Sequence, residues 1–381
     1  MKILHTADWH IGKLLAGRPR LLEQDEVLTE LGEIADREAA DVILVAGDIF
    51  DTATPAAAAQ ALFYRHALRL SAGRHLVAIA GNHDDPERLK APEGLAAACN
   101  IILAGGGDYG VYDSKTVTGG PGFVRIRVRD ETLNLALAPF PSLARLGEKA
   151  DEKTYEEIVR AEIDRAAACF TPGGINVLCA HLFLTGSLTT ANDERELGSA
   201  KLVSPAVLPH AAVYTALGHI HKPFAVPGHN ARYSGSLLSH SFDDASDKQV
   251  LLVETDGTDT AVRAVPLTRG KRLKRRDAHS AAEALDILDR EAGAHVEIVY
   301  RSQVPLTAGE MREIRKKEAY ANLLPLPPES GAAAAASVRR GKSDRELFEQ
   351  FYHSRTGTAA DGDTVELFME LLAGSGEGYT E

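Results

Sequence analysis

Aspartate, asparagine and histidine, whose side chains bind divalent cations, gather in five short clusters along the chain. The candidate ligands in these clusters are Asp8, His10, Asp48, Asn82, His181, His219 and His221. They offer carboxylate and amide oxygen with imidazole nitrogen and no thiolate, which favours Mn²⁺, Fe²⁺, Zn²⁺ or Mg²⁺ over a purely structural zinc site. Seven ligands are too many for one tetrahedral ion. They suit two ions about 3.5–4 Å apart that share a carboxylate and keep positions open for water and phosphate.

The spacing within the clusters also favours metal binding. Asp8 and His10 are two residues apart, and so are His219 and His221. Side chains at this spacing point to the same side of an extended segment, so each pair can bind one ion or bracket two. A glycine stands directly before three of the clusters and permits the sharp turn that directs the next side chain inward. These glycines are Gly47, Gly81 and Gly218.

Apolar runs that precede the clusters predict the strands that position them. The runs cover residues 42–46, 76–80, 175–180 and 213–217, each of buried-strand length. Helical patterns alternate with them at residues 23–39, 55–70 and 155–168. The alternation predicts an α/β domain over residues 1–268. Its ligand clusters follow the carboxyl ends of strands, where α/β sheets commonly bind their ligands.

The sequence from residue 269 onward predicts smaller units. A basic run at 269–276 leads into an expected helix at 281–291, a strand at 296–300 and a helix at 307–317. This order indicates a small α/β capping domain over residues 269–325.

The C-terminal part of the chain is predicted to be a tethered helical unit. Residues 326–342 are rich in proline and alanine and predict a linker. Residues 343–381 carry two short amphipathic patterns, with Phe348, Phe351 and Tyr352 on one side of the first. We expect this unit to bind a partner, with folding back onto the large domain as the alternative.

Composition limits the classes of protein to consider. The 381 residues include 42 Lys and Arg against 54 Asp and Glu, a net charge of -12. Such a field repels nucleic acid, so any binding of it must be local, metal-assisted or supplied by a partner. Three cysteines without a CxxC spacing exclude a disulfide framework and indicate a reducing cytoplasm. No apolar run approaches 18 residues and no signal peptide is evident, so we expect no membrane association.

Each cluster alone is weak evidence. A lone Asp-x-His is common, and Asp48 by itself could cap a helix. Three glycine-led clusters that all follow strands are much less expected by chance, and together they indicate a metal centre. The other histidines are interpreted as surface or packing residues, namely His5, His66, His75, His210, His229, His240, His279, His295 and His353.

The clusters match the motifs of a known superfamily. Asp-x-His occurs at residues 8–10, Gly-Asp-x-x-Asp at 47–51, Gly-Asn-His-Asp at 81–84, a lone histidine at 181 and Gly-His-x-His at 218–221. In these motifs the sequence resembles the calcineurin-like metallophosphoesterase superfamily. Residues 3–12, 45–52, 216–221 and 232–236 are further similar to the SbcD family, the nuclease subunits of bacterial SbcC/SbcD DNA-repair complexes.

The resemblance implies a two-sheet sandwich flanked by helices and a division of the ligands between two ions. One ion would be held by Asp8, His10, Asp48 and His221. The other would be held by Asp48, Asn82, His181 and His219, with Asp48 bridging. Mn²⁺ is the first expectation for both ions, with Mg²⁺, Fe²⁺ and Zn²⁺ as alternatives.

The resemblance also implies catalytic residues beside the metals. His83 would stabilise the transition state or protonate the leaving oxygen, and Asp84 would orient its ring. A purely structural role for His83 is the alternative. Asp51 stands where archaeal relatives usually carry a histidine, so it is left out of the predicted catalytic set.

The implied function is metal-dependent exonuclease and endonuclease activity on DNA. The implied partners are a second copy of the chain and an SbcC-like coiled-coil ATPase. Because the sequence contains no G-x-x-x-x-G-K-[ST] motif, ATP hydrolysis is expected from the ATPase partner. Two alternatives stay open. One is a phosphodiesterase for small nucleotides or a protein phosphatase, and the other is a non-catalytic subunit that keeps the fold.

Overall fold

A computed structural model gives the fold. It describes residues 1–106, 114–142, 154–186, 201–244 and 246–326, together with Phe348, Tyr352, Gly362, Thr364 and Val365. The chain divides into two compact units. Unit 1 comprises Met1–Lys274 with Gly293–His295, and unit 2 comprises Arg275–Ala292 with Val296–Glu381. This division falls six residues after the boundary expected at residue 268.

The first sheet of unit 1 has six strands in the order β15-β14-β1-β4-β5-β6. Their bounds are β1 (Lys2–Thr6), β4 (Val42–Val45), β5 (His75–Ile79), β6 (Ile101–Ala104), β14 (Gln249–Thr255) and β15 (Thr260–Pro266). Strands β1, β4, β5 and β6 are parallel, whereas β14 and β15 add antiparallel pairs. Thr6 pairs with Val45, so β1 and β4 end at the same edge.

The second sheet has seven strands in the order β12-β13-β11-β10-β9-β8-β7. Their bounds are β7 (Val117–Gly120), β8 (Phe123–Val128), β9 (Glu131–Ala138), β10 (Ile175–His181), β11 (Tyr214–Gly218), β12 (Phe224–Ala225) and β13 (Ala231–Tyr233). Strands β9, β10, β11 and β13 are parallel. His181 pairs with Gly218, so β10 and β11 also end together.

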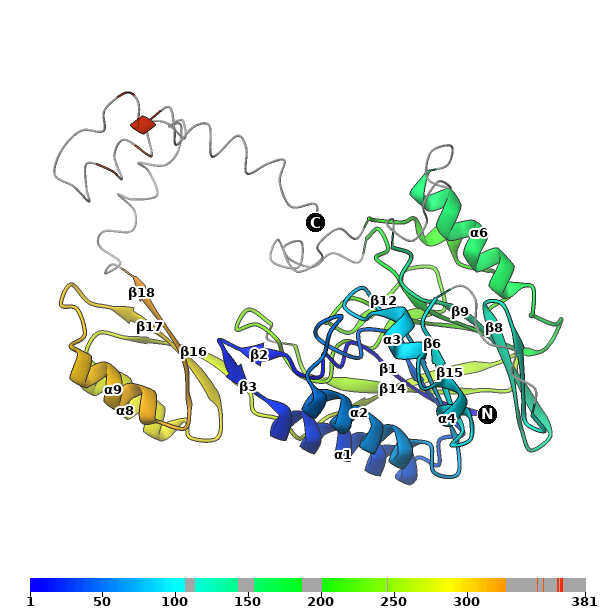
Figure 1. Cartoon of the computed structure of the whole chain (residues 1–381), viewed down its shortest axis with the longest axis horizontal. Helices are drawn as coiled ribbons and strands as arrows, with labels where there is room; N and C mark the ends of the chain where they lie inside the picture. Colours follow the sequence, from blue (N-terminus) through cyan, green and yellow to red (C-terminus); the bar gives the residue numbers. More distant parts are fainter. Residues whose placement is uncertain are drawn as a thin grey trace. The chain divides into compact units, whose positions relative to one another are not determined.

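Helices cover the outer faces of the two sheets (Figure 1). α1 (Leu21–Arg37) and α2 (Ala57–Leu70) pack on the first sheet, and α6 (Tyr155–Ala167) packs on the second. Shorter elements are β2 (Leu14–Leu15), β3 (Arg18–Pro19), α3 (Pro86–Lys90), α4 (Glu93–Ala97) and η2 (Pro205–Val207). These layers confirm the predicted two-sheet sandwich flanked by helices, and they confirm the predicted strands and helices of the large domain.

The sequence of β4 shows why this architecture forms. Every residue of β4 is buried because both faces of the sheet are covered. Side chains alternate along a strand, so Ile43 packs under the helices while Val42 and Leu44 pack between the sheets. From the second sheet, Val177 belongs to the same inter-sheet core. A continuous apolar run therefore specifies a strand that is buried on both sides.

Unit 2 contains the expected helix, strand and helix, with two further strands. The expected elements are α8 (Ala281–Arg290), β17 (His295–Arg301) and α9 (Ala308–Lys316). The additional strands are β16 (Leu273–Ala278) and β18 (Tyr320–Leu326), and β18 is parallel to β17. Both β16 and β17 begin in unit 1. β16 overlaps the basic run, where four charged residues in six hide the strand pattern, and half of its residues are exposed.

The predicted linker at 326–342 and the helical unit at 343–381 lie almost entirely outside the described residues. Phe348 and Tyr352 are both helical, and their ring centroids are 6.0 Å apart, as expected for one face of a helix. Within the part of the chain that the structure describes, no helix has both the length and the apolar character needed to cross a membrane.

Candidate metal centre

The carboxyl ends of five strands, from both sheets, meet at one place. Hydrogen bonds join the loops that follow these strands. The Asp8 carboxylate accepts a hydrogen bond from the backbone N–H of His219 at 2.9 Å, which links β1 to β11. His181 Nδ1 lies 2.8 Å from the carbonyl oxygen of Ala46, which links β10 to β4. Six predicted ligands follow these strand ends and His181 is the last residue of β10, so the fold brings all seven together.

Backbone strain is concentrated among the candidate ligands. Eight described residues other than glycine have a positive φ, and four of them are candidate ligands. Their φ values are 53° at Asp8, 44° at His10, 49° at Asp48 and 103° at His219. Left-handed conformations cost non-glycine residues about 1–3 kcal/mol and persist where surrounding structure imposes them. This clustering marks the strand ends as a functional site.

All three glycines before the clusters are required by close approach, since a Cβ atom on Gly47 would overlap the ring of His181. A Cβ atom on Gly81 would overlap the Asp48 carboxylate, and a Cβ atom on Gly218 would overlap the carbonyl of Ala46. Gly47 has a φ of 91°, which favours glycine for a second reason. The glycines therefore allow the loops to pack closely enough for the ligands to meet.

The first half of the centre joins His10, His221 and Asp48. The Nε2 atoms of His10 and His221 are 3.1 Å apart. His10 Nε2 is also 3.5 Å from Asp48 Oδ2. Three ligand atoms from different loops thus surround a common point.

The second half joins Asn82, His181, His219 and the same oxygen of Asp48. Asn82 Oδ1 lies 3.0 Å from His181 Nε2 and 2.9 Å from His219 Nδ1. His181 Nε2 is 3.5 Å from Asp48 Oδ2. Asp48 Oδ2 therefore faces both halves, as a bridging ligand would.

The donor set fits two cations. Asp8 Oδ2 is buried and has no hydrogen-bond partner among the residues that the structure describes. Burial and the charge of Asp48 raise the pKa of Asp8 well above its usual range. Imidazole nitrogens also face each other at 3.1 Å between His10 and His221, and at 3.3 Å between His181 and His219. A divalent cation in each half would use these lone pairs and offset the cost of burying Asp8 as an anion.

Protonation of the surrounding groups favours metal binding near neutral pH. Burial lowers the pKa of His10 to about 4, and it lowers the pKa values of His181 and His219 as well. Burial alone would raise the pKa of Asp48, but nearby His181 and His10 outweigh it and lower that pKa. The imidazoles are then neutral and Asp48 is charged, the forms that bind metal.

His83 lies beside the first half of the centre. Its backbone N–H donates to Asp48 Oδ1 at 2.9 Å, and its ring centroid is 4.8 Å from that of His10. Its Nδ1 lies 2.8 Å from the carbonyl oxygen of Asp51. This bond orients the ring and leaves Nε2 as the nitrogen that can meet a substrate.

The Asp84 carboxylate joins two loops of the centre. Its carboxylate accepts backbone N–H groups from Gly81 and Phe50 at 2.9 Å and from Ile49 at 3.0 Å. These bonds fasten the loop after β5 to the loop after β4, whereas the His83 ring is oriented by the Asp51 carbonyl. Burial and the charge of Asp48 raise the pKa of Asp84 to about 7.

Three residues of the centre were missed by sequence reasoning. Asp51 Oδ1 is 3.4 Å from His10 Nδ1 and 3.2 Å from Lys13 Nζ, so Asp51 orients a ligand. Lys248 Nζ donates to Asp244 at 2.6 Å and to the carbonyl oxygen of His221 at 3.1 Å. His240 is buried with its ring centroid 4.9 Å from those of His10 and His221. Asp51 was detectable within its motif, whereas Lys248 and His240 stand in a loop without a recognisable pattern.

A family model agrees with this geometry. The model for the calcineurin-like phosphoesterase matches residues 1–223, more than half of the chain and all seven candidate ligands. The chain belongs to the calcineurin-like phosphoesterase family. The resemblance seen in the sequence motifs is thereby confirmed.

Relatives within the calcineurin-like phosphoesterase family match nearly the whole chain. The chain is 34% identical to the SbcD component of nuclease SbcCD from Bacillus subtilis, with 98% of each chain covered. It is 34% identical to the SbcD component from Rhodobacter capsulatus, covering 77% of this chain and 76% of that protein. The identity to the Staphylococcus epidermidis protein of the same name is 25%, over 93% of this chain and 94% of that protein.

Proposed function

We propose that this protein is a metal-dependent DNA nuclease that cleaves phosphodiester bonds as an exonuclease and an endonuclease. The observation that carries the proposal is the meeting of two ligand groups at Asp48 Oδ2, which is 3.5 Å from both His10 Nε2 and His181 Nε2. Similarity to the SbcD component of nuclease SbcCD over 98% of both chains supports DNA as the substrate and a role in repair and in processing DNA ends and hairpins.

In this proposal two divalent cations share Asp48. The first is held by Asp8, His10, Asp48 and His221, and the second by Asp48, Asn82, His181 and His219. When bound, such a pair supplies hydroxide near neutral pH and offsets the negative charge of the phosphate. Four imidazole ligands favour transition metals over Mg²⁺, and we propose Mn²⁺ as the working metal.

His83 is the proposed catalytic residue of the chain itself. Because its Nδ1 is engaged with the carbonyl of Asp51 at 2.8 Å, its Nε2 is available to the phosphate or to the leaving sugar oxygen. Asp84 contributes as a positioning residue, since it fixes the backbone on both sides of the site through Gly81 and Ile49. Substituting His83 should slow cleavage and leave metal binding intact.

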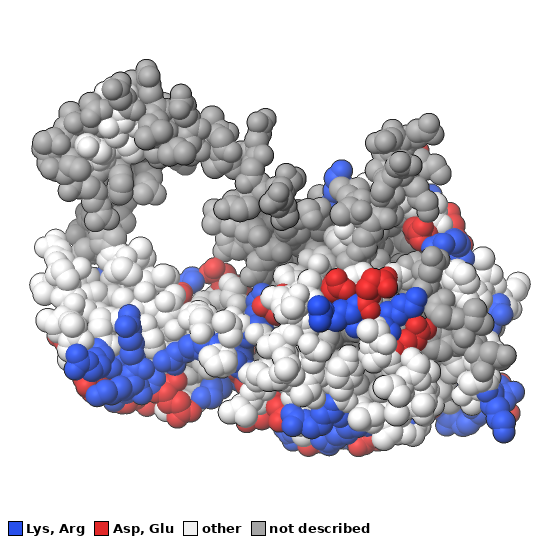
Figure 2. Space-filling model, viewed as in Figure 1, with Lys and Arg blue, Asp and Glu red and all other residues white. Residues whose placement is uncertain are grey.

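The basic run at 269–276 is largely engaged with acidic neighbours within each unit. Arg269 contacts Glu33 at 2.5 Å in unit 1. In unit 2, Arg275 contacts Glu297 at 2.6 Å and Arg276 contacts Glu291 at 2.8 Å. Figure 2 shows acidic side chains beside the basic ones over the visible face. Together with the net charge of -12, these ion pairs support duplex binding through a partner.

The proposed partners are an SbcC-like coiled-coil ATPase and a second copy of the chain. The relatives are named as components of a complex called SbcCD. We assign the ATPase contact to residues 343–381, where Phe348 and Tyr352 supply aromatic anchors. For the homodimer, Leu22 near the start of α1 is 83% exposed and Leu68 on α2 is 53% exposed, which supports a contact through these helices.

We also propose a cytoplasmic location. All three cysteines are free thiols, and Cys169 and Cys179 are buried in the core of unit 1. A chain of this size without disulfides suits a reducing compartment. An ATPase partner requires the same compartment because ATP is supplied there.

The test compares DNA with a small ester as substrates. Metal-free protein is loaded with Mn²⁺ and given linear duplex DNA, single-stranded DNA and bis(p-nitrophenyl) phosphate. We expect DNA cleavage that requires Mn²⁺ and that increases when the ATPase partner and ATP are added. Hydrolysis of the small ester with DNA left intact, even with the partner present, would contradict the nuclease proposal and favour a phosphodiesterase for smaller substrates.

A deletion separates the partner contact from the chemistry. Removing residues 343–381 should abolish co-purification with the ATPase and leave Mn²⁺-dependent hydrolysis of the small ester within about twofold of the full chain, because the metal centre lies wholly in unit 1. Retained co-purification would contradict the assignment of this segment.

A further inference from the structure

A third imidazole faces two of the candidate ligands. His240 lies in the loop after β13, and only 8% of the residue is exposed. Its ring centroid is 4.9 Å from those of His10 and His221, and the rings are inclined by 77° and 80°. A nitrogen from each of the three side chains lies within 4.8 Å of the other two. The loop therefore directs a third nitrogen toward the first half of the centre.

The Nε2 atom of His240 lies in a buried environment. His240 Nε2 is buried and has no hydrogen bond to any residue that the structure describes. An unpaired buried polar atom costs about 1–3 kcal/mol. His75 Nδ1 is unpaired in the same sense, so this feature alone does not define a site. His240 differs from His75 because two further imidazoles surround it.

Three clustered imidazoles cannot satisfy one another. A neutral imidazole has one N–H donor and one lone pair, so a hydrogen bond between two rings satisfies only one lone pair. Protonating the rings would instead place like charges side by side in a buried space. A cation among His10, His221 and His240 accepts a lone pair from each ring.

We propose that His240 supplies a further nitrogen ligand to the ion held by His10 and His221. This inference rests on the proposed two-metal site and deepens it. The first ion then has three nitrogens beside the oxygens of Asp8 and Asp48, whereas the second has two nitrogens beside Asn82 and Asp48. Because nitrogen ligands discriminate against Mg²⁺, His240 makes the first position the more selective for Mn²⁺, Co²⁺ or Zn²⁺.

The test measures metal binding directly on the full chain. Mn²⁺ and Mg²⁺ are titrated by calorimetry into metal-free wild type, His240→Leu and His75→Leu. The last is a matched control because His75 has the same 8% exposure and an unpaired nitrogen but stands at the amino end of β5. In His240→Leu, we expect one of two Mn²⁺ sites to weaken by about 10–100-fold. Its Mg²⁺ affinity should change by less than about threefold, and His75→Leu should keep both Mn²⁺ affinities.

Pulsed EPR supplies a second readout. In the Mn²⁺-loaded protein, His240→Leu should lose nitrogen couplings at one ion that the wild type and His75→Leu retain. If metal-free His240→Leu is not folded by circular dichroism, His240→Gln is measured in its place, with the same expected weakening at one site. Unchanged affinities and couplings in the folded variant would overturn the assignment of His240. Fewer than two Mn²⁺ ions in the wild type would instead overturn the proposed two-metal function, so the two failures are distinguishable.

Discussion

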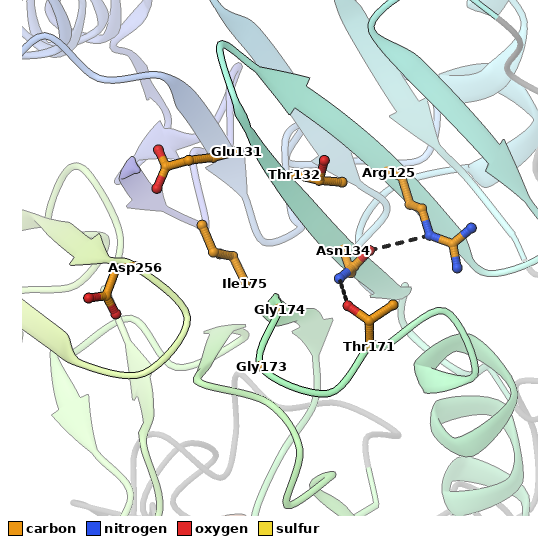
Figure 3. Close-up of a pocket in the computed structure, with 9 residues that line it drawn as sticks. All are labelled: Arg125, Glu131, Thr132, Asn134, Thr171, Gly173, Gly174, Ile175 and Asp256. Carbon is orange, nitrogen blue, oxygen red and sulfur yellow. Dashed lines mark hydrogen bonds between the residues drawn. The ribbon is translucent and has the colours of Figure 1, made fainter.

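The two ends of β10 carry polar side chains in opposite situations. At the amino end, Ile175 borders a hollow that Arg125, Asn134 and Thr171 also line (Figure 3). There Asn134 Nδ2 donates to Thr171 Oγ1 at 3.0 Å, and Asn134 Oδ1 accepts from Arg125 Nε at 3.3 Å. At the carboxyl end, His181 enters a group in which Asp8 Oδ2 has no hydrogen-bond partner among the described residues.

This difference separates a structural polar network from a ligand site. A polar network whose donors and acceptors are paired needs nothing further to be stable in a buried place. Two imidazole nitrogens that face each other, as those of His10 and His221 do at 3.1 Å, can satisfy only one lone pair between them, whereas a cation would use both. We therefore interpret the carboxyl ends of the strands as the reactive edge and the amino end of β10 as a structural one.

The largest effect is expected from removing the shared oxygen at the reactive edge. Asp48→Ala deletes the carboxylate whose Oδ2 is 3.5 Å from both His10 and His181. We expect loss of high-affinity binding of both Mn²⁺ ions and a decrease in DNA cleavage on the order of 10³-fold. Calorimetry and a cleavage assay measure the two effects. A variant that still binds two ions tightly would show that Asp48 does not bridge.

Asp8→Asn should weaken Mn²⁺ binding but stabilise the metal-free protein. Burial and the charge of Asp48 raise the pKa of Asp8 in the folded state. Between pH 3.8, the ordinary pKa, and this raised pKa, the folded state binds more protons than the unfolded state. The free energy of unfolding therefore falls as the pH rises through this range. The metal-free variant should therefore be more stable than the wild type, by a margin that grows with pH above 3.8. Its Mn²⁺ affinity should decrease about 10–100-fold.

Urea unfolding of the metal-free proteins at several pH values and Mn²⁺ calorimetry check this pair of effects. Wild-type stability above that of the variant at every pH would contradict the account, because Asp8 would then be stabilised by partners other than metal.

For a paired carboxylate away from the centre, the contribution to stability should depend on pH in the opposite direction. Burial disfavours ionisation of Glu23, but hydrogen bonds from Arg20 and His295 outweigh it and lower the pKa of Glu23 to about 2 from an ordinary value of 4.5. Its stabilising contribution is therefore full above pH 4.5 and is lost as the pH falls toward 2.

Glu23→Gln should consequently destabilise the fold by about 2–3 kcal/mol at neutral pH. The difference from the wild type should shrink below pH 4.5. Urea unfolding along a pH series measures it, and a difference that stays constant on acidification would be inconsistent with this linkage.

The smallest effect is expected at the structural end of β10. Asn134→Leu removes the hydrogen bonds to Thr171 and to Asn176, which are 3.0 and 2.9 Å long. We expect a loss of about 1–3 kcal/mol in the free energy of unfolding. Both Mn²⁺ affinities should stay unchanged, because the site lies at the opposite end of the strand. A weakened metal site in this variant would show that the two ends are coupled.

Much of the metal centre was predictable because its residues occupy positions with a local signature. Strands such as β4 and β10 are largely apolar runs, and each candidate ligand lies at or just after the end of a strand. The sheet then brings these ends together without any further information. Strands β8 and β16 were not predicted, because their exposed charged side chains weaken the apolar pattern.

Other parts of the centre depend on contacts between distant segments. His240 is far from His10 in sequence, and only the folded loop places their ring centroids 4.9 Å apart. The bonds from the backbone N–H groups of Ile49 and Phe50 to the Asp84 carboxylate likewise join two separate loops, and they were not predicted. Such contacts follow from loop packing, which the sequence does not reveal by spacing.

A crystal structure of the Mn²⁺-loaded protein, with the ions located by anomalous scattering, tests the central claim most directly. We expect two peaks about 3.5–4 Å apart at the carboxyl ends of the strands, both in contact with Asp48. A single peak, or two peaks that do not share Asp48, would contradict the assignment of this edge as a two-metal centre.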